Sequence, residues 1–100
     1  MSVKIGKSNP HNSKVTRVFT KRIKMFQKVC GASLANKGRY KAGEVVLQFS
    51  LDASGKAQSM KTLKYTTSHA MAHCVSNRMK KASFPKMDKP TTFKQTILFK

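Results

Sequence analysis

Apolar residues in the first third of the chain recur at steps of three or four positions. This spacing places them on one face of an α-helix, and six residues keep it: Val15, Phe19, Ile23, Phe26, Cys30 and Leu34. Asn12 or Ser13 can cap the start of such a helix, and Gly38 is a natural terminator. The pattern therefore predicts a first helix that begins near Ser13 and ends before Gly38.

The next segment has a two-residue period, which is typical of a half-buried β-strand. Its apolar positions are Val45, Leu47, Phe49 and Leu51. Asp52 to Gly55 then form a tight turn in which Gly55 can take a positive φ, and a second strand runs to about Tyr65. The two-residue period fails in this second strand, which predicts a β-bulge near Gln58 and Ser59. Together the two strands form a hairpin.

A second helix follows the hairpin, and a third strand ends the chain. Thr67 or Ser68 can cap the helix, and Pro85 ends it. Its apolar face carries Met71, Cys74, Val75, Met79 and Ala82. After Pro90 a two-residue period returns, at Phe93, Gln95, Ile97 and Phe99. The predicted order is helix, strand, strand, helix, strand.

These elements predict an α+β fold of two layers, in which two helices cover one face of a small three-stranded, mostly antiparallel sheet. One hundred residues suffice for one such domain but not for a second domain with its own core. Residues 13–100 are predicted to form the domain. Residues 1–12 lack apolar periodicity and are predicted to be a flexible lead-in.

The chain carries 21 lysines and arginines against three acidic residues, which gives a formal charge of +18. This imbalance predicts an anionic partner or anionic surroundings. The predicted basic face of the two helices consists of Lys14, Arg17, Lys21, Arg22, Lys24, Lys28, Arg78, Lys80 and Lys81. In the cytoplasm the partner would be nucleic acid, bound non-specifically, although no aromatic stacking platform accompanies the charge. In the periplasm it would be lipopolysaccharide, cell wall or an acidic protein segment.

The sequence offers little for catalysis. The three acids are widely separated and provide no carboxylate pair, and there is neither a glycine-rich phosphate loop nor a serine-centred elbow. We therefore predict that the chain is not an enzyme and needs no cofactor. His69 and His73 have the spacing of two ligands on one helix, but no third ligand converges on them, and we expect no metal site.

Two cysteines, Cys30 and Cys74, allow one disulfide in an oxidising compartment or two buried thiols in a reducing one. No run approaches the ~20 apolar residues of a membrane span. Residues 1–13 lack the apolar core of a secretory signal. The chain is therefore either cytoplasmic or a piece of a longer, exported protein, and composition alone leaves both questions open.

Four pieces of the chain, in order, resemble the TonB-like C-terminal domain of the AgmX/PglI type, a branch of the TonB C-terminal domain superfamily. They are a basic helix with a cysteine, the segment GEVVLQFSLDASGKA at 43–57, the run AHCV at 72–75 with the basic stretch that closes on Phe84-Pro85, and the alternating last strand. The resemblance covers about residues 14–99.

The spacing of the cysteines also matches this family. Thirteen positions separate Cys30 from Gly43, and ten separate Cys74 from Phe84. The chain departs from the family where members usually carry an aromatic residue and an acid after the first cysteine and an acid before the second. The residues at these positions are Gly31, Ala32 and His73.

The resemblance implies a Cys30–Cys74 disulfide and a periplasmic location, normally at the end of an inner-membrane-anchored protein. It also implies a role in energy transduction, transport or gliding motility, with an envelope protein or peptide as partner. Domains of this kind bind a partner segment as an added strand at a free sheet edge. On this chain the implied edge strand is the last one, with the residues Thr92, Phe93, Lys94, Gln95, Thr96 and Ile97.

Overall fold

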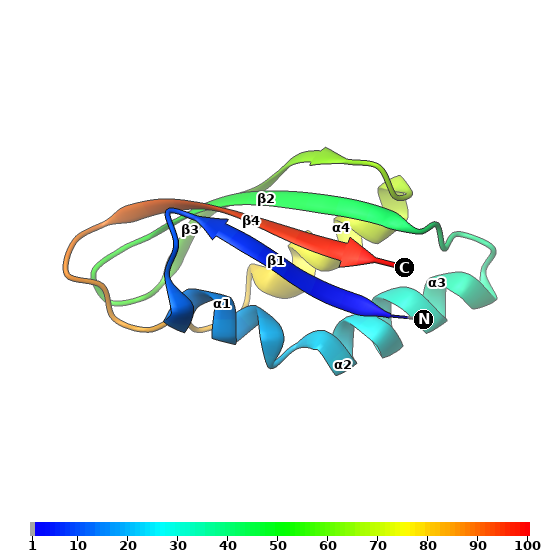
Figure 1. The fold of residues 1–100 in the computed structure, drawn as a ribbon, viewed down its shortest axis with the longest axis horizontal. Coiled ribbons are helices and arrows are strands. Elements are labelled where there is room, and N and C mark those ends of the chain that lie inside the picture. The colour runs from blue at the N-terminus through cyan, green and yellow to red at the C-terminus, as the bar shows by residue number, and fades with distance from the viewer. Residues whose placement is uncertain (1) are drawn as a thin grey trace.

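The computed structural model describes residues 2–100 and has the predicted two-layer α+β fold (Figure 1). One layer is a four-stranded antiparallel sheet in the order β1-β4-β2-β3. Its strands are β1 (Val3–Asn9), β2 (Gly43–Leu51), β3 (Ala57–Tyr65) and β4 (Thr91–Phe99). Helices cover one face of this sheet: α1 (Ser13–Thr20), α2 (Ile23–Met25), the π-helix η1 (Phe26–Ala32), α3 (Ser33–Asn36) and α4 (His69–Met79).

Residues 3–9 form a strand, which corrects two predictions: the flexible lead-in over 1–12 and the three-stranded sheet. β1 pairs antiparallel with β4 and packs against α1 and α2. Its apolar signal is short, because the two-residue period covers only Val3 and Ile5 and ends at Lys7. Val3 is nonetheless buried. The strand forms because it pairs with β4, which lies about ninety residues further along the chain. Local sequence patterns do not indicate so distant a pairing partner.

The first predicted helix is interrupted at residues 21–22. Asn12 caps its first segment, α1, because Asn12 Oδ1 accepts hydrogen bonds from the backbone N–H groups of Lys14 and Val15. A threonine side chain at the end of α1 bonds to the backbone one turn earlier, an interaction that bends helices. α2, η1 and α3 continue without a further break, and η1 buries Phe26, Cys30 and Gly31. None of the described helices has the length and apolar character that crossing a membrane requires.

Asp52 organises the predicted turn between β2 and β3. Its Oδ1 accepts hydrogen bonds from the backbone N–H and the hydroxyl of Ser54 and from the backbone N–H of Lys56. Gly55 has a φ of +88, as predicted, and a Cβ there would lie 2.3 Å from the carbonyl oxygen of Phe84. The turn therefore needs glycine for its backbone angle and for the close approach of the Phe84 segment.

The hydrogen bonds at this turn, first among them that of the Ser54 side chain, hold the pKa of Asp52 below its usual value of 3.8. A lowered pKa means that the carboxylate stabilises the fold above pH 3.8, and that this contribution is lost as the pH falls through the folded-state pKa. Ser54→Ala should therefore raise the pKa of Asp52, which NMR titration of the carboxyl carbon measures. The matched control is Ser33→Ala, at an exposed serine of α3. An unmoved Asp52 midpoint in Ser54→Ala would contradict this account.

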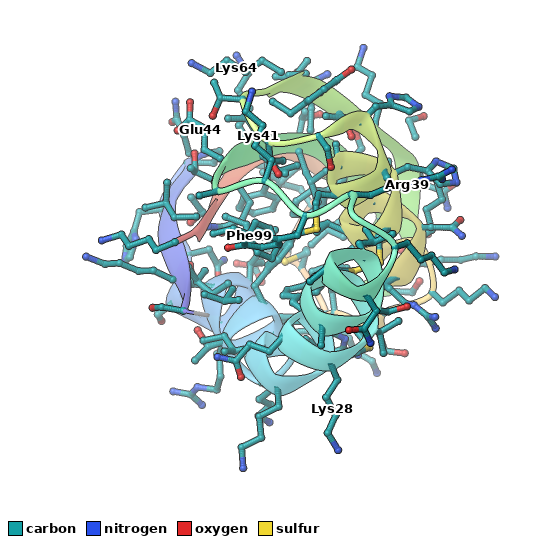
Figure 2. The ribbon with its side chains drawn as sticks, turned by 90° about the vertical axis from the view of Figure 1, so that its right-hand side faces the viewer. Lys28, Arg39, Lys41, Glu44, Lys64 and Phe99 are labelled. Carbon is teal, nitrogen blue, oxygen red and sulfur yellow. A yellow bond between two sulfur atoms is a disulfide. The ribbon has the colours of Figure 1, made fainter. Side chains whose placement is uncertain are left out.

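Phenylalanine rings fill the centre of the core between the sheet and the helices. The Phe49 ring of β2 lies among three others, with centroid distances of 5.7 Å to Phe19, 5.3 Å to Phe84 and 5.9 Å to Phe93. Phe49 and Phe19 have no exposed surface. Phe99 of β4 also points into the space between the layers (Figure 2). These rings join α1 and the segment after α4 to the two central strands.

A disulfide joins Cys30 of η1 to Cys74 of α4, with the two Cα atoms 5.7 Å apart. Cys30 is fully buried, whereas Cys74 is half-buried. The pairing implied by the family resemblance is thus confirmed. It ties the two helical segments together on the face of the sheet that they share.

Candidate functional site

Residues 92–97, which were predicted to form a free edge of the sheet, lie inside it. β4 is paired with β2 on one side and with β1 on the other. The prediction of an open edge at these residues is therefore wrong. The physical reason is the unpredicted strand, because β1 runs beside β4 and occupies the edge that a three-stranded sheet would leave open (Figure 1).

The pairing of β4 with β2 is regular. It extends from Thr91 opposite Leu51 to Phe99 opposite Gly43 without a register shift. Along β4, the side chains alternate between the helix-covered face and the open face of the sheet. Phe93, Gln95 and Ile97 are buried against the helices, and Thr92, Lys94 and Thr96 lie on the other face. β4 is therefore held in a regular register by β2, independently of its pairing with β1.

The pairing of β4 with β1 is irregular, and its irregular point is at Gln95. The register shifts between Ile5 and Ser8, and the side chain of Gln95 fills the gap. Gln95 Nε2 donates to the backbone oxygens of Gly6, at 2.7 Å, and of Thr96, at 3.0 Å. Gln95 Oε1 is buried and has no hydrogen-bond partner among the described residues. A buried acceptor without a donor costs on the order of 1–3 kcal/mol, so the hydrogen bonding between β4 and β1 is incomplete at Gln95.

The opposite edge of the sheet is β3, which pairs with β2 only. Its pairing shifts register twice, and Ser59 has a φ of +53, so the predicted bulge near Gln58 and Ser59 is confirmed. Lys61 and Lys64 are exposed on this strand. Bulges and lysines on an edge strand both hinder the addition of another strand. β3 is therefore a protected edge.

The nine predicted basic residues are spread over several segments of the helical layer. Lys14 and Arg17 lie in α1, and Lys21 and Arg22 form the break after it. Lys24 lies in α2 and Lys28 in η1. Arg78 lies in the last turn of α4, and Lys80 and Lys81 come directly after that helix. Lys28 points away from the body of the molecule (Figure 2). The structure brings six of the nine together around two neighbouring hollows, and it leaves Lys24, Lys28 and Lys80 outside them.

The first of these hollows, of about 280 Å³, is lined by Lys14, Arg17, Val18, Lys21 and Pro85. The second, of about 390 Å³, lies against the end of α4 and is lined by Arg22, Met25, Asn77, Arg78, Lys81 and Ala82. Lys21 lines the first hollow and Arg22 the second, and these two residues are consecutive at the break between α1 and α2. We call the two together the cationic groove.

The rings of His69 and His73 are stacked on the exposed side of α4, with centroids 6.3 Å apart. His69 Nδ1 lies 3.3 Å from the hydroxyl of Tyr65. Within residues 2–100, no group of three or more histidine, cysteine or acidic side chains is arranged to hold a metal ion. The pair therefore has a neighbour in β3 but no set of converging ligands.

The comparisons with known proteins bear on the fold. No protein-family model matches the chain, and no curated protein matches it. Among solved structures, it is similar to the NMR solution structure of the Helicobacter pylori TonB C-terminal domain, residues 179–285, with a TM-score of 0.62 and 22% sequence identity. The match covers 84% of this chain and 80% of that one. The chain therefore has the fold of a TonB C-terminal domain.

Proposed function

We propose that this chain is a periplasmic protein-interaction domain of the TonB-like, AgmX/PglI type, without catalytic activity of its own. Its partner is an envelope protein or peptide that takes part in energy transduction, transport or gliding motility. The fold of a TonB C-terminal domain supports this proposal, as does the disulfide, because disulfides persist in oxidising compartments such as the periplasm. The same disulfide weighs against the alternative of a cytoplasmic nucleic-acid-binding domain.

The partner segment binds as a β-strand beside β4, at residues 92–97, and takes the place of β1. The observation that carries this step is the contrast between the two seams of β4. Its pairing with β2 is uninterrupted, whereas its pairing with β1 is bulged and leaves Gln95 Oε1 without a donor. A strand without the bulge would meet a complete row of backbone donors and acceptors on β4.

β1 contributes few apolar side chains to the core. Val3 is buried and Ile5 is half-buried, but Gly6 at the centre of the strand has no side chain to pack. Glycine within a strand also costs about 0.5–1 kcal/mol in backbone entropy. The apolar surface that β1 itself would bring into solvent on leaving is therefore small. β3, by contrast, is protected by bulges and lysines, so the β4 edge is the better site for a partner strand.

The test compares two variants. In the locked chain a disulfide ties β1 to β4, and in the released chain β1 has lost its apolar contacts with the domain. Lys4→Cys with Leu98→Cys places two thiols at a directly opposed pair of β1 and β4, within the range that a disulfide spans. Val3→Asp with Ile5→Asp removes the apolar contacts of β1. The probe is a synthetic peptide of residues 2–9, SVKIGKSN, titrated into ¹⁵N-labelled protein. The expected affinity for the peptide is highest in the released chain, lower in the unmodified chain and lowest in the locked chain, with at least about a ten-fold gain on release because one buried and one half-buried apolar side chain are lost.

Lys4→Ser with Leu98→Ser is the matched control, since it changes the same positions without forming a bridge. It should bind the peptide at least as well as the unmodified chain does. Shifts at the amides of 92–99 in the released chain would support strand exchange. Equal binding by the locked chain, or shifts confined to β3 or the helices, would refute it.

A further inference from the structure

We propose that the cationic groove is a second binding surface, which takes the phosphate groups of anionic lipids at a membrane surface. The proposal is independent of strand exchange, because the groove contains no residue of β1 or β4. Its cations come from two distant parts of the sequence, 14–22 and 78–81, and only the tertiary fold assembles them. They are Lys14, Arg17, Lys21, Arg22, Arg78 and Lys81.

The charge of the groove exceeds what the helices need for their own stability. α1 and α4 both end beside it, and cations at a helix C-terminus offset a partial charge of about −0.5 each. Two such ends account for about one unit of negative charge. Six cations less one unit leave an excess of about five positive charges. The excess is therefore available to an external anion.

The acidic residues of the chain do not neutralise the groove. Glu44 forms an ion pair with Lys64 on the sheet, with Oε1 and Nζ 3.4 Å apart. Asp52 is engaged by hydrogen bonds in the turn between β2 and β3. Asp88 lines a neighbouring hollow together with Lys14 and is the acid nearest to the groove. Neither hollow of the groove is lined by an acidic side chain.

Arg22 lines the second hollow and is held in place by a hydrogen bond to the backbone. It is half-buried, and its Nη1 donates to the backbone oxygen of Val18 at 3.1 Å. A guanidinium has five N–H donors in a planar fork, a geometry that suits phosphate oxygens. Arg78 and Lys81 are exposed on the other wall. The fixed guanidinium of Arg22 and the two exposed side chains of Arg78 and Lys81 thus line the same hollow.

The floor of the groove is apolar. Val18, Met25 and Pro85 are half-buried, and Ala82 is buried. A cationic rim over an apolar floor suits the boundary between lipid headgroups and acyl chains. Nucleic acid is the less fitting occupant for two reasons: no aromatic side chain lines either hollow for base stacking, and a disulfide-stabilised protein belongs to compartments without nucleic acid.

The test is co-sedimentation of the full chain with vesicles of phosphatidylglycerol and phosphatidylcholine in equal amounts, compared with phosphatidylcholine alone. The groove variant is Arg22→Gln, Arg78→Gln, Lys81→Gln. Because each cation near an anionic surface contributes roughly a five-fold gain in binding, its partition coefficient should fall on the order of 100-fold. Arg78→Gln, Lys81→Gln, which leaves the half-buried Arg22 intact, should lose on the order of 20-fold.

The matched control is Lys37→Gln, Lys41→Gln, Lys61→Gln, which removes three exposed charges outside the groove. It should lose no more than about five-fold, through the long-range field alone. Equal losses in the control and groove variants would overturn the proposal, because binding would then follow net charge. So would a failure of the unmodified chain to prefer anionic vesicles. Tight binding to a random DNA duplex with loss in the groove variants, without vesicle binding, would assign the groove to nucleic acid instead.

Discussion

Phe49→Ala is expected to lower the free energy of unfolding by about 3–5 kcal/mol, the usual cost of removing a buried phenylalanine. Phe49 has no exposed surface, and its ring lies within 6.0 Å, centroid to centroid, of the rings of Phe84, Phe19 and Phe93. The cavity would open between the sheet and the helices, and the three neighbouring rings would lose a packing partner. Urea unfolding followed by circular dichroism measures the loss.

The control for this cavity is Leu63→Ala, at a large apolar residue that is exposed on β3. Its cost should stay within about 0.5 kcal/mol, the range for surface substitutions. A domain of this size has a total stability of roughly 5–15 kcal/mol, so Phe49→Ala should remove a considerable share of it. A loss below about 1 kcal/mol would mean that the ring is not the centre of the core.

Cys30→Ala with Cys74→Ala should cost on the order of 4 kcal/mol, because the native disulfide closes a loop with a sequence separation of 44 and so restricts the unfolded chain. In a small domain each kcal/mol lowers the melting temperature by roughly 4–8 °C, so a drop on the order of 15–30 °C is expected. Calorimetry of the oxidised wild type and the double variant measures it. Alanine is the appropriate replacement because Cys30 is fully buried and a serine hydroxyl would lack a partner there.

The matching observation in the wild-type chain is its intact mass. Protein from the native compartment, alkylated without reduction, should lack two protons relative to the reduced chain and carry no alkyl groups. Two alkylated thiols would count against both the bridge and the periplasmic location. A double variant with an unchanged melting temperature would show that the helices hold each other without the bond.

The elements that were predicted correctly are those whose signal is local. β2 and α4 bury one face each, so their apolar residues repeat with a clean period. The turn at Asp52 and Gly55 depends on backbone chemistry that these two residue types carry wherever they occur. The break in the first helix was missed because Phe19 and Ile23, on either side of it, are four residues apart and so keep the spacing of a continuous helix.

The parts that were missed depend on pairing across the chain. β1 has only Val3 and Ile5 as an alternating signal before Gly6, too few to distinguish a strand from an extended tail. β4 is an inner strand because β1 pairs with it. Since β1 was not predicted, the prediction that residues 92–97 form an open edge was wrong as well. The basic residues of the cationic groove could be predicted, but their grouping in space could not. No local pattern in the sequence indicates that Arg22 and Arg78 line the same hollow. Gln95 gave no signal beyond the alternation of its strand.

The two ends of the described chain leave the domain side by side, since Ser2 and Lys100 exchange backbone hydrogen bonds in both directions. Tension applied between these ends acts across the ladder of β1 and β4 rather than along it. Hydrogen bonds loaded in this direction break one pair at a time, from the outermost inward, so the force needed is that of a single pair and not of the whole strand. A pull on the ends would thus load the outermost pair of β1 and β4 first, and would begin to unzip β1 from β4, which stays paired to β2 on its other side.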